Sequence, residues 1–504
     1  MLVIISDLHL SDGTTNAALD PGALQIFADR LTDLAMRASW RSDGRYRPID
    51  RVDLLLLGDV LDILESRRWL DSGTRPWEDP QSPKVSETVS SIVDGILLQN
   101  RDSLSVLRSL YGEGAIHIPH ASQTGEPIYA GDGHSVAVRT FYMVGNHDWP
   151  LHLRGPRYDL IRQKVVNQIG LANGSSLPFP HDATECDDLL QVLRRHRVIA
   201  RHGDIYDPIN FCEERDSSSV GDAIVIELLC RFVLELEQGL GAELPPATLA
   251  GLRDMDRIRP LLLVPAWIEG LLQRTNVSPA TRKHIKRTWD QLADEFLQLS
   301  VVRDHDTWSP FDLVDGLERA LKFSKRLSIG WIGRVTQWLQ QLRGVESDSY
   351  AAHALTEEDF RNRRARHIVY GHTHVAENIP LDASYADGFV LNQVYFNSGT
   401  WRRVYHPTHA LPNDREFIPS DCLSYLTFYC GDERGGRSFE TWSGTLATEP
   451  AENAVHRVDT GRAVQDSDQL SPAHRIPVRS PHFQRPTAVP RTSSAARPDS
   501  ARQK

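Results

Sequence analysis

The amino-acid sequence predicts an α/β protein, and two patterns along the chain support that prediction. Five short apolar runs are rich in β-branched and aromatic residues, and most are followed directly by Gly or Asp, as buried strands often are. Other stretches place apolar residues at helical spacing, as Ile285, Trp289 and Leu292 do. Strands interleaved with helices are typical of α/β folds. The five runs are residues 2–5, 52–57, 141–144, 198–200 and 367–370.

A polar motif follows each of the five apolar runs. Open sheets build their sites just beyond the carboxyl ends of their strands. We therefore expect the five motifs to converge on one place, although each motif alone is common in turns and loops. In chain order the motifs are Asp7-Leu8-His9, Gly58-Asp59 with Asp62, Gly145-Asn146-His147-Asp148, His202-Gly203-Asp204 and Gly371-His372-Thr373-His374.

The residue types in these motifs suit divalent metal ions. Carboxylate, carboxamide and imidazole groups bind Mn, Fe, Zn or Ni, and no thiolate is needed. Asp7 and His9 are two residues apart, so on an extended segment their side chains project to the same face. His372 and His374 repeat that spacing and could each reach a different ion of a close pair. Glycines before three of the motif residues allow the backbone turns that bring ligands in closely.

The ordered set of motifs resembles that of the calcineurin-like metallophosphoesterase superfamily. The family pattern is Asp-x-His, Gly-Asp-x-x-Asp, Gly-Asn-His-Asp/Glu, a lone His and Gly-His-x-His, and every position is filled over residues 1–210 and 360–430. The resemblance implies an α/β fold in the form of a four-layer αββα sandwich, with two divalent metal ions at the sheet edge. It implies one ion held by Asp7, His9 and His374, a second held by Asn146, His202 and His372, and Asp59 as the bridge between them.

The resemblance also implies a dinuclear-metal-dependent phosphoester hydrolase. A hydroxide bridging the two ions would attack a phosphomonoester, a phosphodiester or a pyrophosphate. His147 would be the acid that protonates the leaving oxygen, and Asp148 would orient or polarise it. Manganese is the expected metal, with Fe, Zn or Ni as alternatives. The alternative functions are a DNA or RNA nuclease of the same superfamily and a non-catalytic scaffold that kept the fold.

Two departures from the family pattern bear on the substrate. The Arg-Gly that protein Ser/Thr phosphatases place after the second Asp is missing after Asp62, and Asp148 stands where those enzymes carry Glu. Both departures disfavour a protein phosphatase. The phrases at 6–11 and 397–401 look more like the bacterial branch that contains UDP-diacylglucosamine pyrophosphohydrolases. Some members of that branch have Arg where His147 stands, so the expected substrate is stated only as a small-molecule phosphoester.

Composition and charge indicate where the protein acts. The formal net charge of −11 over 504 residues argues against a general nucleic-acid binder, which would show a basic surface. Five widely spaced cysteines form no zinc pattern, so reduced thiols are expected. The first predicted strand begins at Leu2, so a cleavable signal before it is not expected. No run of about 18 apolar residues occurs. Together these features predict a cytoplasmic protein.

Four regions are expected along the chain. Residues 1–212 and 361–446 form the two parts of the catalytic core, and an insertion at about 66–138 interrupts the first part. Residues 213–360 form a helical insertion or cap, in which Ser278-Pro279 resembles the start of a helix. From 447 to 504 the composition predicts a disordered tail.

Three features of these regions leave alternatives open. Apolar stretches at 261–268 and 327–342 could form a lid for peripheral membrane association, but we favour the insertion's own core. Arg402 and Arg403 could meet a substrate phosphate, although such arginines are more often solvated. The run 423–429 is expected as a late strand of the second sheet.

Overall fold

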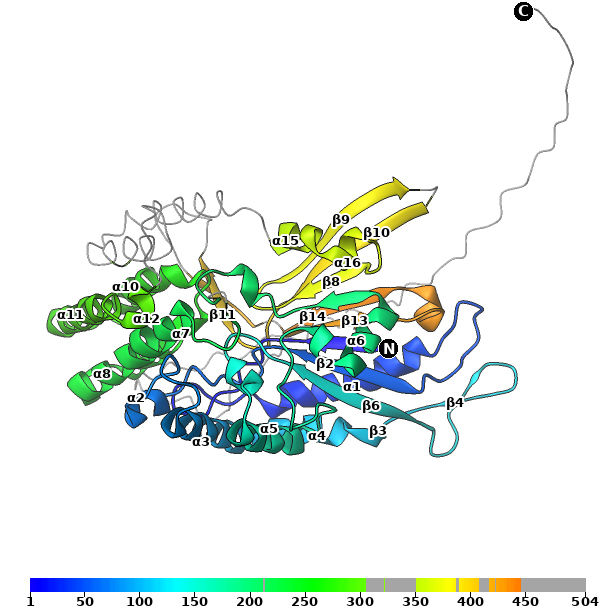
Figure 1. The fold of residues 1–504 in the computed structure, drawn as a ribbon, viewed down its shortest axis with the longest axis horizontal. Coiled ribbons are helices and arrows are strands. Elements are labelled where there is room, and N and C mark those ends of the chain that lie inside the picture. Colours follow the sequence, from blue (N-terminus) through cyan, green and yellow to red (C-terminus); the bar gives the residue numbers. More distant parts are fainter. Residues whose placement is uncertain are drawn as a thin grey trace, which may run out of the picture. The chain divides into compact units, whose positions relative to one another are not determined.

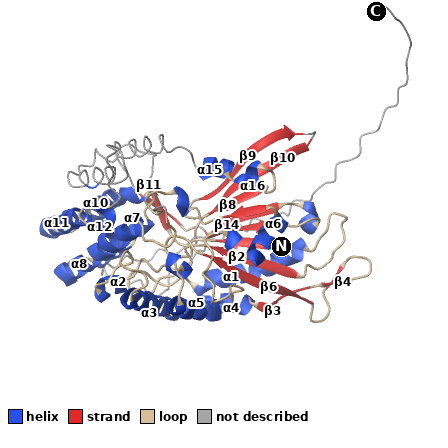
Figure 2. Cartoon of the chain, viewed as in Figure 1, coloured by secondary structure: helices blue, strands red, loops and turns tan. Residues whose placement is uncertain are grey.

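The computed structural model describes most of the chain as a mixed α/β fold with several sheets (Figures 1 and 2), as the two sequence patterns predicted. The predicted tail at 447–504 and the apolar stretch at 327–342 lie outside the described residues. The described residues are 1–211, 214–304, 321, 350–386, 389–407, 417–421 and 423–445.

The larger sheet has six strands in the order β14-β13-β1-β2-β6-β3. Strands β1, β2 and β6 run parallel to one another in its middle, and each contains or overlaps one of the predicted strands. Strand β6 is longer than predicted because the chain is already extended before its apolar end. The six strands are β1 (Leu2–Ile5), β2 (Arg51–Leu57), β3 (Gly112–Ile118), β6 (His134–Met143), β13 (Leu423–Phe428) and β14 (Phe439–Gly444).

The second sheet has four strands in the order β7-β8-β10-β9. Strands β7, β8 and β10 are parallel, and β9 pairs antiparallel with β10 at the edge. The predicted strands at 198–200 and 367–370 are therefore neighbours in this sheet. Its strands are β7 (Val198–Ala200), β8 (His367–Tyr370), β9 (Ala376–Ala386) and β10 (Phe389–Ser398).

The run at 423–429 forms the predicted strand, but its assignment to the second sheet was wrong. Strand β13 pairs antiparallel with β1, with Leu2 opposite Phe428, and so belongs to the six-stranded sheet. The physical reason is that β2 occupies only one edge of β1. If the other edge of β1 were uncovered, the backbone N–H and C=O groups of this buried strand would lack partners. Strand β13 covers that edge.

Alternate residues of β1 enter two different cores. Leu2 and Ile4 belong to a buried cluster with Val198, Val369 and Phe396 of the second sheet. The intervening residues of β1 point the other way, into a cluster that includes the apolar faces of helices. Those helices are α1 (Pro21–Ala38), α3 (Pro83–Gln99), α4 (Arg101–Leu110) and α5 (Pro156–Ile169).

The described secondary-structure elements of the predicted insertion at 213–360 are helices, joined by short loops. Ser278 caps α11, and its hydroxyl accepts a hydrogen bond from the backbone N–H of Thr281 at 3.1 Å. Trp267 and Ile268 are buried in the insertion's own cluster, which is the alternative favoured for 261–268. The helices are α7 (Val220–Ala223), a π-helix (Ile224–Cys230), α8 (Arg231–Leu240), α9 (Pro246–Arg253), α10 (Val264–Arg274), α11 (Pro279–Phe296), α12 (Ser300–Arg303), α15 (Tyr350–Thr356) and α16 (Glu358–Arg361).

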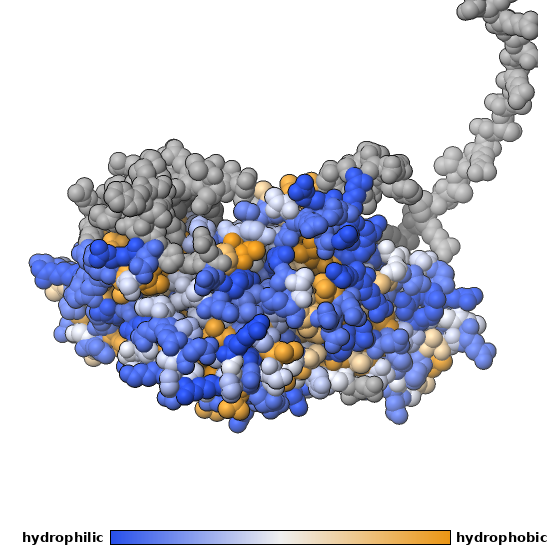
Figure 3. All heavy atoms as spheres, in the orientation of Figure 1, coloured by the Kyte–Doolittle hydropathy of each residue, from blue (hydrophilic) through white to orange (hydrophobic). Residues whose placement is uncertain are grey.

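The remaining elements are short and lie around the sheets. Strand β11 (Val404–Pro407) pairs with β12 (Phe417–Ser420), and both contact Trp267 of the insertion through aromatic rings. The face seen in Figure 3 is largely hydrophilic, with hydrophobic groups scattered over it. Within the described residues, no helix has the length and apolar character to cross a membrane. The other elements are α2 (Arg68–Ser72), α6 (Asp187–His196), β4 (His120–Ala121) and β5 (Pro127–Ile128).

Candidate metal centre

The five strand ends bring the predicted ligands together, as the motif positions suggested. Asp7, Asp59 and Asn146 follow β1, β2 and β6 of the larger sheet, whereas His202 and His372 follow β7 and β8 of the second. Backbone hydrogen bonds tie these loops to one another. The N–H of Asp7 donates to the carbonyl of Gly58 at 3.1 Å, and the N–H of Gly371 donates to the carbonyl of His202 at 2.8 Å.

A first group of ligand atoms comes from four buried residues whose donor atoms all lie within 4.8 Å of one another. The Nε2 atoms of His9 and His374 are 3.0 Å apart, and Nε2 of His374 is 3.3 Å from Oδ1 of Asp7. Asp59 completes the group, with Oδ2 at 3.7 Å from Nε2 of His9. The group could hold a metal ion, and its members are those predicted for one of the two ions together with the bridge.

A second group contains Asp59 again, with His202 and His372. Oδ2 of Asp59 lies 3.1 Å from Nε2 of His202. The Oδ1 atom of Asn146 joins the group at 3.2 Å from Nε2 of His202 and 2.9 Å from Nδ1 of His372. These are the residues predicted for the other ion. Asp59 is common to both groups, which is the position that a bridging carboxylate requires.

Three of the histidines are oriented by acceptors on their other ring nitrogen. Nδ1 of His9 donates to Asp62 at 2.9 Å, and Nδ1 of His202 donates to the carbonyl of Leu57 at 3.0 Å. Nε2 of His372 donates to Asp207 at 3.1 Å. Such contacts fix the tautomer of a metal-binding histidine. The remaining ring nitrogens therefore present lone pairs to the centre, facing carboxylate and carboxamide oxygens.

Lone pairs that face one another at about 3 Å repel unless a cation lies between them. Burial alone would lower the pKa of His202, but the Asp59 carboxylate outweighs it and holds that pKa well above its usual range. Burial, in turn, raises the pKa of Asp7 to about 6. A proton on an imidazole relieves the repulsion in part, and a metal ion displaces such protons when it binds. The residues present therefore fit a pair of divalent ions.

The backbone is strained at the ligands. Asp7, His9, Asp59, His372 and His374 all have positive φ, between 46° and 68°, and they make up five of the nine non-glycine residues of this kind in the described chain. Each costs roughly 1–2 kcal/mol relative to an ordinary conformation. Strain of this kind gathers at functional sites. Its concentration here is independent support for a working centre, and spacing alone did not predict it.

The predicted role of the motif glycines is visible at two of them. A Cβ on Gly371 would lie 2.7 Å from Oδ2 of Asp7 and 2.9 Å from Oγ of Ser6. A Cβ on Gly145 would collide with the Asp59 carboxylate and lie 2.7 Å from Nε2 of His202. Only glycine lets these strand ends approach the ligands so closely.

His147 lies at the mouth of the centre, with 17% of its side chain exposed. Its backbone N–H donates to Oδ1 of Asp59 at 2.8 Å, and its Nδ1 donates to Oδ1 of Asp62 at 2.8 Å. Asp148 was expected to orient His147, but its carboxylate accepts from the N–H groups of Val60 and Gly145 and from the hydroxyl of Tyr142. The orienting role therefore passes to Asp62, because Asp148 is already used in holding the loops together.

Arg402 and Arg403, the two arginines considered for a substrate phosphate, differ in their partners. Arg402 is only 9% exposed and forms ion pairs with Asp62, Glu65 and Asp256, whereas its neighbour Arg403 is exposed and pairs with Asp421. Arg402 is thus a structural cation that ties the insertion to the core.

Arg259 of the insertion was not identified from the sequence. Its Nη2 lies 2.7 Å from Nδ1 of His374, and its Nη1 donates to the backbone carbonyls of Asp256 and Ile258. No carboxylate of the described residues forms a salt bridge with it. The backbone N–H of Arg259 donates to the carbonyl of Tyr405 at 3.0 Å, which fixes the residue beside the core. The sequence carried no signal for it, because the contact joins distant parts of the chain.

Comparison with known proteins adds no assignment. The chain matches no model of a protein family, and a search of curated proteins finds no match. The function of the chain is therefore inferred from the geometry of this centre.

Proposed function

We propose that the protein is a dinuclear-metal-dependent phosphoester hydrolase. The observation that carries the proposal is that Asp59 belongs to both groups of ligand atoms, one with His9 and the other with His202. Two divalent ions, when bound there, would activate a water molecule and neutralise charge on a phosphoryl group. Manganese is the metal we propose first, since oxygen and imidazole ligands suit it.

His147 is the acid in this proposal. Burial alone would lower the pKa of its imidazole, but the carboxylates of Asp62 and Asp59 outweigh burial and raise that pKa to about 9. In the metal-free chain these carboxylates favour the protonated ring, and Asp62, which contacts the ring directly, would keep a proton on it for transfer to the leaving oxygen. The hydrogen bond from Nδ1 to Asp62 leaves Nε2 as the atom that donates. Acid catalysis of this kind contributes about 10²- to 10⁴-fold.

Arg259 binds the anionic substrate in this proposal. Among the described residues, the partners of its guanidinium are the imidazole of His374 and two backbone carbonyls. A cation left without a carboxylate beside a metal centre suits a phosphate, which accepts two parallel hydrogen bonds from one guanidinium. Because Arg259 comes from the insertion, that region would take part in choosing the substrate.

We also propose membership of the calcineurin-like metallophosphoesterase superfamily and its four-layer arrangement. The support is the buried cluster shared by the two sheets, with helices packed on their other faces. The substrate we propose is a small phosphomonoester, phosphodiester or pyrophosphate. The three described cysteines, Cys186, Cys230 and Cys430, are free thiols, which agrees with the proposed cytoplasmic location.

A substrate panel with the Mn²⁺-loaded protein tests the proposal. The panel compares an aryl phosphate, a bis-aryl phosphate, a nucleotide sugar and single-stranded DNA, with the Asp59→Asn variant as the inactive control. Hydrolysis of any of the first three, lost in the variant, is the expected result. Hydrolysis of the DNA alone would favour the nuclease alternative. No hydrolysis by protein that holds two ions would favour the scaffold.

A further inference from the structure

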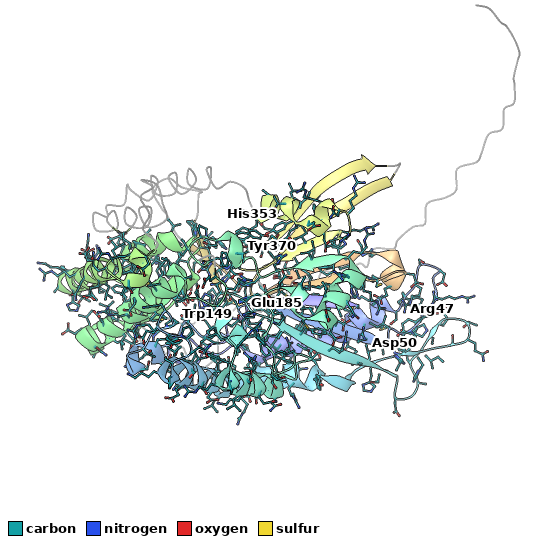
Figure 4. The ribbon with its side chains drawn as sticks, viewed as in Figure 1. Arg47, Asp50, Trp149, Glu185, His353 and Tyr370 are labelled. Atoms are coloured by element: carbon teal, nitrogen blue, oxygen red, sulfur yellow. The ribbon has the colours of Figure 1, made fainter. Side chains whose placement is uncertain are left out.

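A second cluster of histidines and carboxylates lies outside the dinuclear centre. His152, His181 and Asp216 each offer one ligand atom, and these atoms lie within 4.8 Å of one another. Nδ1 of His152 is 2.5 Å from Oδ1 of Asp216, and its Nε2 is 3.3 Å from Oε2 of Glu185. Glu185, just before α6, is labelled in Figure 4. Two imidazoles and a carboxylate are ligands of the kind that bind zinc in proteins.

His181 supplies an independent observation. Its side chain is 2% exposed, and neither ring nitrogen has a hydrogen-bond partner among the described residues. Its ring centroid lies 4.3 Å from that of His152. A buried imidazole nitrogen without a hydrogen-bond partner destabilises the folded state. A buried histidine beside a second histidine and the Asp216 carboxylate is the arrangement that a bound cation would complete.

The backbone holds the two histidines in place without an ion. The carbonyl of Leu151, next to His152, accepts from Phe179 at 3.2 Å, and the carbonyl of Pro180, next to His181, accepts from Val144 at 3.0 Å. The backbone N–H of His181 also donates to Glu185 at 2.9 Å. Ligands fixed by the fold lose little freedom on binding a metal, which favours affinity.

The charges around the cluster leave it net negative. Arg215 is the nearest cation, but its guanidinium pairs with Asp204 at 2.8 Å and reaches only the backbone carbonyl of His181, at 3.5 Å. Asp216 and Glu185 have side chains that are 49% and 43% exposed, so an ion can enter from solvent. In a tetrahedral zinc site with bonds of about 2.0–2.2 Å, the ligand atoms stand roughly 3.3–3.5 Å apart. The ligand atoms of His152, His181 and Asp216 lie within 4.8 Å of one another, so side-chain rotation would have to bring them to that spacing.

We propose that His152, His181 and Asp216, with Glu185 beside them, bind a zinc ion distinct from the dinuclear pair. The ion ties together three loops: the one that follows the His147 motif, the one that leads to α6, and the one around 215–216. His181 and Asn146, a predicted ligand of the dinuclear centre, line the same hollow. The zinc ion would therefore stabilise the loops that line this hollow beside Asn146, and its role is structural.

The rival account is a plain ion pair. Burial alone would lower the pKa of His152, but hydrogen bonds to Asp216 and Glu185 outweigh it and raise that pKa to about 9. A protonated His152 between two carboxylates needs no metal. It leaves the buried nitrogens of His181 unexplained, however, and it predicts no binding of zinc at this place. The two accounts therefore differ in a measurable quantity.

Equilibrium dialysis against Zn²⁺ alone, followed by elemental analysis, separates them. The wild-type chain is compared with Asp216→Asn, which keeps the size and hydrogen-bonding capacity of a half-exposed side chain, and with Asp188→Asn as the matched control on the exposed face of α6. We expect Asp216→Asn to bind one equivalent of zinc fewer than the wild type, and the control to lose none. Equal zinc in all three proteins would overturn the proposal.

A second measurement keeps this site apart from the dinuclear centre. The Asp59→Asn variant should still hold one equivalent of zinc, and the double variant Asp59→Asn with Asp216→Asn should hold none. A crystal of the zinc-soaked wild type should show an anomalous peak at the zinc edge between the rings of His152 and His181. Absence of that peak, in a crystal whose dinuclear centre is occupied, would contradict the third ion and leave the proposed hydrolase untouched.

Discussion

The two oxygens of the Asp62 carboxylate serve two histidines of different function: Oδ2 accepts from His9 and Oδ1 accepts from His147, at 2.9 and 2.8 Å. One carboxylate therefore orients both a proposed metal ligand and the proposed acid. Asp62 is buried, and although burial would raise its pKa, the charge on His147 holds that pKa well below its usual range. The proposed metal centre and the proposed acid are therefore joined by the hydrogen bonds of this one side chain.

Replacing His147 by Gln should lower kcat for an alkyl phosphate about 10²- to 10⁴-fold, because the leaving alkoxide needs the proton. The kcat for an aryl phosphate should fall much less, because its leaving group is stable without a proton. Both rates are measured on the Mn²⁺-loaded protein, with metal content checked in parallel. Equal losses for the two substrates would show that His147 is not the acid.

Asp62→Asn should have a wider effect than His147→Gln. It removes the charge that keeps His147 protonated and also the acceptor that orients His9, so metal affinity and rate should fall together. Loss of an orienting partner typically costs about 10- to 100-fold in metal affinity. Metal titrations of the two variants make the comparison. An unchanged metal affinity in Asp62→Asn would show that Asp62 does not support metal binding through His9.

Arg259→Gln should lower kcat/KM for a phosphomonoester by about 10- to 150-fold, the loss expected when a charged group's hydrogen bonds, worth roughly 1.5–3 kcal/mol, are removed. Arg259→Lys should recover part of it, since it restores the charge but not the two-pronged geometry. Arg253→Gln, an exposed arginine of the same insertion that pairs with Glu237, is the matched control. An equal loss of kcat/KM in the control would show that the loss comes from a less stable insertion and not from a missing contact with the substrate.

Gly371→Ala should weaken metal binding and reduce activity, because the added Cβ would lie 2.7 Å from the Asp7 carboxylate. Gly174→Ala is the control, since its Cβ would meet nothing within 4 Å. Metal content after dialysis is the measurement for both. Full metal content in Gly371→Ala would mean that the strand ends tolerate more separation than the structure gives them.

Stability should decline as the pH falls from about 6.5 toward 4, in part because of His367. Burial, together with Arg366 and Arg197, lowers the pKa of this histidine to about 4, and its ring lies among Phe396 and Phe428. In the unfolded chain the imidazole titrates near 6.5. Below that pH the unfolded state binds the proton and the folded state does not, so unfolding is favoured. Above pH 6.5 both forms are neutral and the effect vanishes.

His367→Phe should reduce that acid dependence. Denaturant unfolding at pH 7.5 and pH 5 gives the measurement, as the difference between the two free energies of unfolding. The difference should be smaller in the variant than in the wild type. An unchanged difference would assign the acid sensitivity to other buried groups.

Much of the fold and the centre could be predicted from the sequence, because strands and motifs are local patterns. The strands before Asp7, Asp59 and His372 were recognisable from short apolar runs, and the glycines before Asp59, Asn146 and His372 indicated a close approach of the backbone. The sequence did not predict which strands pair when they lie far apart in the chain. The place of β13 beside β1 depends on which sheet edge is open, and no local pattern records that.

The same limit applied to partners of the centre. The hydrogen bonds of His147 to Asp62 and of His372 to Asp207 join residues 85 and 165 positions apart in the sequence. Asp148 stands next to His147 in the chain, and the family resemblance implied that it would orient or polarise that histidine. Folding turned its carboxylate to backbone N–H groups instead, where it satisfies buried donors. Neighbours in sequence were thus a poor guide to which carboxylate meets which imidazole.

Manganese bound per chain, measured together with phosphoester hydrolysis during a titration of metal-free protein, tests the central claim most directly. The account predicts that wild-type protein binds two Mn²⁺ ions that Asp59→Asn does not bind, and that hydrolysis rises with those two ions and then levels off. Asp59→Asn that binds as much Mn²⁺ as the wild type, or wild-type protein that holds both ions and hydrolyses no phosphoester, would contradict it.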